Sequence, residues 1–127
     1  INNIKKTKLE RGLTVYTRSA FLQGLLLTKN IQKWRSANVM NPKDVINWLG
    51  TITIEQNRKS LTDTCLAFVR SQNWIDGIVI GVDTEQQLQD NLEIFSQPLM
   101  TGNIVQSIVK RTPLLSEATL DPSNWRK

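Results

Sequence analysis

Residues 74–91, WIDGIVIGVDTEQQLQDN, decide how this chain folds. The largely apolar run over 75–82 predicts a strand, and this strand stops at Gly81-Val82-Asp83. Thr84 and Gln87 then form a T-x-x-Q capping box, which predicts that a helix begins at this point. A helix that starts directly after a strand and a glycine presents unpaired backbone N–H groups and a partial positive charge. The stretch therefore predicts an anion site, of the kind that holds a phosphate.

Other segments complete an alternation of strands and helices. Residues 13–21, LTVYTRSAF, are β-branched and aromatic, and they predict another strand. Asn41 and Pro42 start a helix that we expect to run to about Asn57, and the box at residues 60–63, SLTD, starts the next helix. Strands separated by helices are typical of a parallel α/β fold. Two parallel strands have bare edges, so they need further strands beside them.

The segments outside this alternation are less regular. Gly12 is expected to end a polar helix at the beginning of the chain. Residues 29–41 have no helical or strand periodicity and are expected to form a loop. Leu88, Leu92 and Phe95 recur at the spacing of a helix packed on a sheet. Residues 97–127 are expected to be a C-terminal tail with one short helix.

The composition limits the class of protein. The chain has 127 residues, which suits one domain, and its mean hydropathy is −0.29. It contains no histidine and one cysteine, Cys65, which excludes Ser-His-Asp and Cys-His catalysis and the common zinc sites. Cys65 falls on the apolar stripe of the helix that follows residue 60, so we expect a buried core residue. No run of apolar residues is long enough for a membrane span, and a cytoplasmic protein is favoured.

The positive charge is concentrated in residues 1–35. This segment has eight Lys and Arg residues and one acid, Glu10, whereas the net charge of the whole chain is +5. A basic patch for nucleic acid or phosphate is one interpretation. A solvated helix followed by a basic loop is favoured instead, because no aromatic side chains alternate with these charges to stack on bases.

Three stretches resemble the C-terminal part of the aldo-keto reductase family. GVDTEQQLQDN at 81–91 is similar to the family's late G-x-x-[ST]-x-E-Q-L-x-[DE]-N segment. RSAFLQGLLL at 18–27 resembles its seventh-strand motif, YSPLxxGxL, with Ala20 in place of Pro and Phe21 in place of Leu. SLTDTCLAFVRSQNWIDGIVIG, between them, resembles the helix and strand that follow. The variant at 18–27 is similar to a bacterial branch linked with surface-sugar biosynthesis.

The resemblance implies that the chain is the C-terminal fragment of a (β/α)8 TIM barrel, a single partial domain over 1–127 that contains barrel strands seven and eight. It also implies a nicotinamide nucleotide as cofactor, held after these strands. Ser19, Phe21 and Gln23 would contact the pyrophosphate and nicotinamide. The ribose and adenine would contact Gly81, Asp83, Thr84, Gln87, Asp90 and Asn91.

The chain departs from the family pattern in two respects. No basic residue occupies 81–87, where family members that bind NADP place Arg or Lys, and Asp83 would repel a 2′-phosphate. An Asp that accepts from a free ribose hydroxyl favours NAD slightly, although both NAD and NADP remain candidates. The family's catalytic Asp, Tyr, Lys and His belong to its earlier strands, and Tyr16, on a late strand, does not match the catalytic tyrosine.

Two functions are consistent with these features. In the first, the parent protein is an NAD(P)H-dependent oxidoreductase that reduces a carbonyl compound, such as an aldehyde, ketone or sugar derivative, and the 127-residue chain alone is inactive. The partners would then be the substrate and the missing N-terminal half of the barrel. In the second, the chain is a non-catalytic half-barrel that associates with another copy or binds an acidic partner. Neither nucleic acid nor a membrane is an expected partner. The sequence has no G-x-G-x-x-G, which argues against a Rossmann unit.

Overall fold

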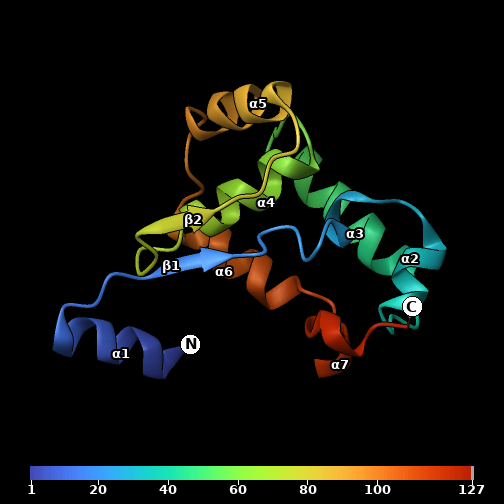
Figure 1. Ribbon diagram of the computed structural model, residues 1–127, viewed down its shortest axis with the longest axis horizontal. Helices are drawn as coiled ribbons and strands as arrows, with labels where there is room; N and C mark the ends of the chain where they lie inside the picture. The colour runs from blue at the N-terminus through green and yellow to red at the C-terminus, as the bar shows by residue number, and fades with distance from the viewer. Residues whose placement is uncertain (127) are drawn as a thin grey trace. The chain divides into compact units, whose positions relative to one another are not determined.

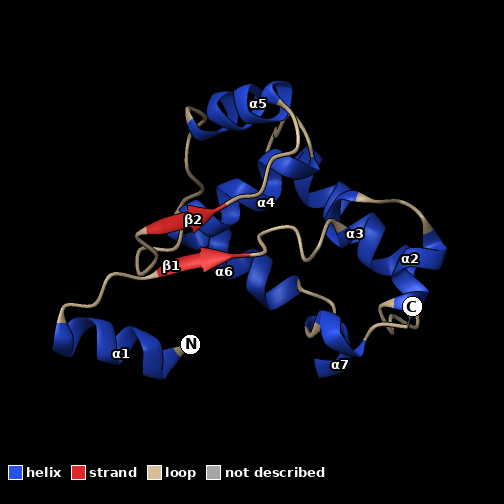
Figure 2. Cartoon of the chain, viewed as in Figure 1, coloured by secondary structure: helices blue, strands red, loops and turns tan. Residues whose placement is uncertain are grey.

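The computed structural model describes residues 1–126, and helices make up most of this part of the chain (Figures 1 and 2). Two short strands lie side by side and point the same way. The elements in chain order are α1 (Asn2–Arg11), β1 (Tyr16–Arg18), η1 (Leu25–Leu27), α2 (Ile31–Ser36), α3 (Pro42–Glu55), α4 (Leu61–Arg70), β2 (Gly77–Val79), α5 (Glu85–Phe95), α6 (Gly102–Arg111), α7 (Glu117–Leu120) and η2 (Pro122–Asn124).

The sheet is parallel, with Tyr16 opposite Gly77 and Arg18 opposite Val79. The predicted α/β class with parallel strands is therefore confirmed in this coarse form. The predicted strand lengths, 13–21 and 75–82, are wrong, since each strand has only three residues. Ser19 ends β1 because its φ of 61° is a left-handed conformation that a strand cannot contain. Beyond Val79, β2 finds no further partner among the described residues.

The chain forms two compact units. The first unit consists of Ile1–Ala20 and Leu66–Val105, and the second consists of Phe21–Cys65 and Gln106–Lys127. The first unit therefore contains both strands and α5, and the second contains α2, α3 and α7. The chain passes between the units at three places: after Ala20, which follows β1, and inside α4 and α6.

A cluster of buried side chains forms the core of the second unit. Trp34 of α2 is completely buried, and its indole Nε1–H donates to the Thr28 carbonyl at 2.8 Å. Val45 and Leu49 of α3 pack in the same cluster, on the helix face that the sequence predicts. The other members are Leu25, Ala37 and Val39, with Leu22, Leu26, Ile46, Trp48, Leu61, Leu115 and Trp125 around them.

The helix ends follow the local sequence closely. Gly12 has φ 63° and ends α1, and the Asn41-Pro42 pair begins α3, as predicted. The Ser60 hydroxyl accepts the Asp63 N–H at 3.1 Å, so this capping box also forms. The loop predicted over 29–41 is wrong in its middle, because the Asn30 side chain caps the short helix α2.

The side chains predicted to pack α5 on a sheet do not do so. Leu88 is 47% exposed and Leu92 is 64% exposed, whereas Ile94 is buried. The C-terminal end of α5 is instead held by Arg70 of α4, whose guanidinium donates to the Ile94 carbonyl at 3.1 Å and lies 5.0 Å from the Phe95 ring centroid. Both of these contacts lie at the C-terminal end of α5, so this end anchors the helix.

The segment predicted as a C-terminal tail, 97–127, contains α6, α7 and η2 within its described residues. Helix α6 contains the apolar residues at 104–109 that predict a short helix. Trp125 packs against the core of the second unit, and its Nε1–H donates to the Thr119 carbonyl at 2.9 Å. The Arg126 N–H donates to the Ser36 carbonyl at 2.9 Å, so the tail is fixed to the end of α2.

Candidate functional site

The site predicted for a nucleotide begins where β1 and β2 end. Because the strands are parallel and Arg18 pairs with Val79, their carboxyl ends meet at one edge of the sheet. Ser19 follows β1 directly, and Gly81 comes two residues after β2. Open α/β sheets bind ligands in this position, beyond the carboxyl ends of the strands.

The start of α5 has the geometry of an anion site. The Thr84 hydroxyl caps the helix by accepting the Gln87 N–H at 3.1 Å, and the Gln87 Oε1 accepts the Asp83 N–H at 2.8 Å. The predicted capping box therefore forms, although Gln87 reaches one residue further back than the N-cap itself. Among the described residues, the backbone N–H groups of Glu85 and Gln86 have no partner. They are free to donate to a bound anion.

The segment after β1 is strained. Ser19, Leu22 and Gln23 have φ values of 61°, 46° and 54°, and Gly24 follows with φ 78°. Left-handed backbone is unusual for non-glycine residues, above all for a bulky residue such as Leu22, and each instance costs roughly 1–3 kcal/mol. Among the described residues, no loop or turn hydrogen bond engages the backbone N–H groups of 20–24. Strain of this kind is common in functional loops, so the segment is a candidate for ligand contact.

The predicted nucleotide residues divide between the two units. Ser19, Gly81, Asp83, Thr84, Gln87, Asp90 and Asn91 belong to the first unit, while Phe21 and Gln23 belong to the second. All residues from 81 to 90 are exposed. The Asp90 carboxylate accepts from the Gln86 side chain at 2.8 Å, and Asn91, one residue further along α5, is half-buried.

Arg18 is a candidate that sequence reasoning missed. It is the last residue of β1, it is exposed, and its guanidinium has no ion-pair partner among the described residues. It is therefore the cation closest in the chain to the strained segment. Its place within the predicted strand, as the first residue of the family-like motif RSAFLQGLLL, could have identified it.

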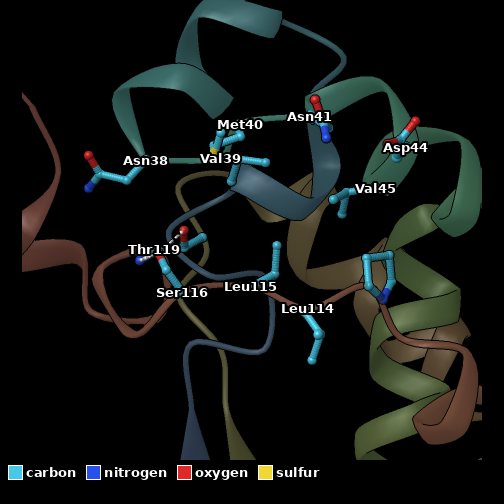
Figure 3. Close-up of a pocket in the computed structure, with 11 residues that line it drawn as sticks. Asn38, Val39, Met40, Asn41, Asp44, Val45, Leu114, Leu115, Ser116 and Thr119 are labelled. Carbon is cyan, nitrogen blue, oxygen red and sulfur yellow. Dashed lines mark hydrogen bonds between the residues drawn. The ribbon is translucent and has the colours of Figure 1, made fainter.

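A pocket in the second unit lies apart from these residues in the chain. Its volume is about 340 Å³, and it lies between the α2–α3 connection and residues 113–119 (Figure 3). Buried Val39 and Val45 contribute to its lining, whereas Met40 and Leu114 are almost fully exposed. None of the predicted nucleotide residues lines this pocket.

Cys65 takes no part in either place. It is buried, and burial raises the pKa of its thiol to about 12. The thiol therefore stays protonated at neutral pH and is a weak nucleophile, in agreement with the prediction of a core residue. In residues 1–126, no three Cys, Asp or Glu side chains gather as a metal site.

No family model, curated protein or solved structure matches the chain. Within residues 1–126, no helix is both long enough and apolar enough to cross a membrane.

Proposed function

We propose that the chain is the C-terminal part of a TIM-barrel oxidoreductase similar to the aldo-keto reductases, which uses NADH or NADPH to reduce a carbonyl compound. Its role is to bind part of the nucleotide at the carboxyl ends of β1 and β2. The proposal rests on one observation within the first unit. Strand β1 is followed directly by Ser19 with its left-handed backbone, β2 is followed by a capped helix, and the two strands end at the same edge of the sheet.

The chemistry of the groups at this edge fits a dinucleotide. The free N–H groups at the start of α5 suit a phosphate, and Arg18 adds a cation without an ion-pair partner in the described chain. The Asp83 carboxylate can accept hydrogen bonds from ribose hydroxyls. The Asn91 side-chain amide can donate to and accept from the edge of the adenine base. When bound, the nicotinamide nucleotide would supply the hydride, and these residues would only bind and orient it.

The site favours NAD slightly over NADP. Asp83 and Glu85 are exposed carboxylates at the start of α5, and the segment 81–87 contains no basic residue. A 2′-phosphate beside these two carboxylates would be repelled, whereas a free 2′-hydroxyl can donate to Asp83.

A fluorescence titration with NADH and with NADPH tests the proposal. Energy transfer from tryptophan to the reduced nicotinamide should give saturable binding, with Kd on the order of micromolar. Asp83→Arg should tighten NADPH binding roughly tenfold relative to NADH, because it replaces a repulsive charge with a phosphate ligand. Asp44→Arg is the matched control, since Asp44 is also an exposed acid near the N-terminus of a helix but lies in the second unit.

The control variant should leave both dissociation constants unchanged. Absence of saturable binding, or equal effects of the two variants, would contradict the proposed nucleotide site. Carbonyl reduction is not expected from the chain alone, because the resemblance assigns the catalytic residues to earlier strands of the barrel.

A second candidate function, self-association as a half-barrel, is favoured by the surface of the first unit. Both outer edges of the sheet are unpaired among the described residues, and Val79, Leu88 and Leu92 are 59%, 47% and 64% exposed. The apolar stretch at 18–27 contributes less than the sequence suggests, because Leu25 is buried in the core of the second unit. Sedimentation equilibrium separates the alternatives: a monomer that binds NADH excludes self-association as the role.

A further inference from the structure

The net charge of the chain resides in one unit. The first unit has six Lys and Arg residues and six Asp and Glu residues, so its net charge is zero. The second unit has ten basic and five acidic residues, so it carries the whole +5. The basic segment 1–35 is therefore divided between the two units. The positive charges of α1 are balanced by acidic residues of the first unit.

Three of the five acidic side chains in the second unit are committed to partners of their own. Glu55 forms a two-fold hydrogen-bonded ion pair with Arg111, at 2.7 and 2.9 Å. Asp63 is buried against Arg58, and the Asp121 carboxylate accepts from Ser123. These carboxylates cannot neutralise the cations around α2 without breaking their present bonds.

The cations around α2 are exposed and have no ion-pair partner in the described part of the chain. Trp34 faces the core, and Lys33 and Arg35 lie on either side of it in the helix, about 100° around the axis in each direction. They therefore flank the solvent-facing side of α2. Arg126 sits at the C-terminal end of the helix, where its N–H donates to the Ser36 carbonyl, and the end of the described chain lies beside α2 (Figure 1).

The backbone of α2 and of the chain end beside it is held in place by contacts within the second unit. Asn30 caps α2, Trp34 is fully buried beneath it, and Trp125 holds the tail against the same core. Only the long side chains lose freedom on binding, which limits the entropic penalty of association.

We propose that Lys33, Arg35 and Arg126, with Lys29, form a surface on the second unit that binds an acidic segment of a partner protein. The guanidinium groups match carboxylates in two-fold hydrogen bonds. Helix α2 has six residues, a length of about 9 Å, which corresponds to about three residues of an extended peptide. This inference is independent of the proposed nucleotide site.

Nucleic acid fits this surface less well. Trp34 is buried and Trp125 packs on the core, so neither presents an aromatic face for base stacking. Duplex DNA carries one charge per about 1.7 Å, and salt-sensitive binding to it commonly involves about 6–10 phosphate contacts, more than these four cations provide.

The test is fluorescence anisotropy of a labelled tetraglutamate peptide, compared with tetraglutamine and with a short DNA duplex. The double variant Lys33→Glu/Arg35→Glu should weaken tetraglutamate binding by roughly tenfold, since two charged contacts become repulsive. Lys43→Glu/Lys59→Glu is the matched control, because it also lies in the second unit and gives the same net charge of +1. Its effect should stay within about twofold.

Both double variants are first checked by thermal unfolding, and the pairs Lys33→Gln/Arg35→Gln and Lys43→Gln/Lys59→Gln replace them if either Glu variant unfolds. Equal losses in the two variants would mean that net charge alone drives binding, and would overturn the proposed surface. Tetraglutamine bound as tightly as tetraglutamate, or duplex DNA bound more tightly than both, would overturn it as well. Failure of this test leaves the NADH titration unaffected, so the two proposals stand or fall separately.

Discussion

Gly77 and Tyr16 show how a single cross-strand pair shapes the sheet. A Cβ atom at Gly77 would lie 2.6 Å from the Tyr16 ring, so the aromatic ring occupies the space above the glycine. Tyr16 is 68% exposed and is therefore free to move aside if a methyl group is added. The contact of Tyr16 with Gly77 gives this tyrosine a structural role.

A double-mutant cycle should detect this contact. In a Tyr16→Ser background, Gly77→Ala should stabilise the fold by roughly 0.5–1 kcal/mol, because glycine is unfavourable inside a strand. In the native background, displacement of the ring should cancel that gain, so we expect a coupling of about 1 kcal/mol by urea unfolding. Gly81→Ala is the control, since no atom lies within 4 Å of its added Cβ, and it should show no coupling to Tyr16.

Asp76 links α1 to the beginning of β2. Its carboxylate accepts from the Lys8 ammonium and from the Val15 N–H, the latter at 2.7 Å. The hydrogen bond from Lys8, and then that from Val15, hold the pKa of Asp76 below its usual value of 3.8. A carboxyl whose pKa is lower in the folded state stabilises the fold above its unfolded pKa, and this contribution disappears as the pH falls through the folded pKa.

Asp76→Asn should therefore be less stable than the native chain at neutral pH, and the difference should shrink below about pH 3.8. The measurement is the free energy of unfolding in urea at several pH values. Lys8→Gln should reproduce part of the effect, because the Val15 N–H remains as a donor. If the native and Asp76→Asn chains differ equally in strongly acidic and in neutral solution, the Asp76 carboxylate is not the source of the stability.

The individual residues that the sequence predicts correctly act locally. Thr84, Ser60 and Gly12 satisfy neighbouring backbone groups, and Cys65 follows the apolar stripe of its helix. Ser19 is different: its sequence suits a strand, and its left-handed backbone arises from the turn that follows β1. Such a conformation is set by surroundings that a single sequence does not display.

At the scale of elements, α3 and α4 offer a direct comparison of helix starts. Each has an Asp as its third residue, Asp44 in α3 and Asp63 in α4. Asp63 is 1% exposed and accepts the Lys59 N–H at 3.0 Å, and it pairs with the half-buried Arg58. Asp44 is exposed. The same residue at the same helical position therefore has two different environments.

Asp63→Ala should destabilise the chain by about 3 kcal/mol, because it removes the buried acceptor of the Arg58 guanidinium and the Lys59 N–H. Asp44→Ala should cost less than about 1 kcal/mol, the value of an exposed acid near a helix N-terminus. Thermal and urea unfolding of the two variants provide the comparison. Similar losses in both would show that helix capping, rather than the buried pair, accounts for the effect.

Helices are predicted well where an apolar face meets a core, and poorly where it does not. The Val45, Leu49 and Ile52 face of α3 is buried, as its periodicity indicates. Helix α2 escapes prediction because one buried residue, Trp34, anchors a six-residue helix whose sequence is mostly polar. The exposed Leu88 and Leu92 of α5 show the opposite case, in which the right periodicity has no described surface to cover.

For the molecule as a whole, the two units are interleaved along the chain. Each consists of two segments that are far apart in sequence, so no single stretch of sequence contains a complete unit. The sequence predicts the alternation of strands and helices, but not this division, because the division depends on which buried faces meet.

Separation of the chain within the α3–α4 turn should therefore disable both units. Fragments 1–56 and 57–127 should each lack a cooperative unfolding transition, since β1 lies in one and β2 in the other. Their equimolar mixture should regain helical circular dichroism and cooperative melting. Cooperative folding of either fragment alone would show that a unit does not need both of its segments.

The pairing of β1 with β2 also has a consequence for the chain while it is being made. Val15 and the Asp76 carboxylate that binds it are 61 residues apart in the sequence. At a synthesis rate of about 5–20 residues per second, β1 leaves the ribosome roughly 3–12 s before its partner strand exists. During that interval its hydrogen-bonding edge is open to any other strand within reach, including the same segment of a chain emerging from the next ribosome on the message.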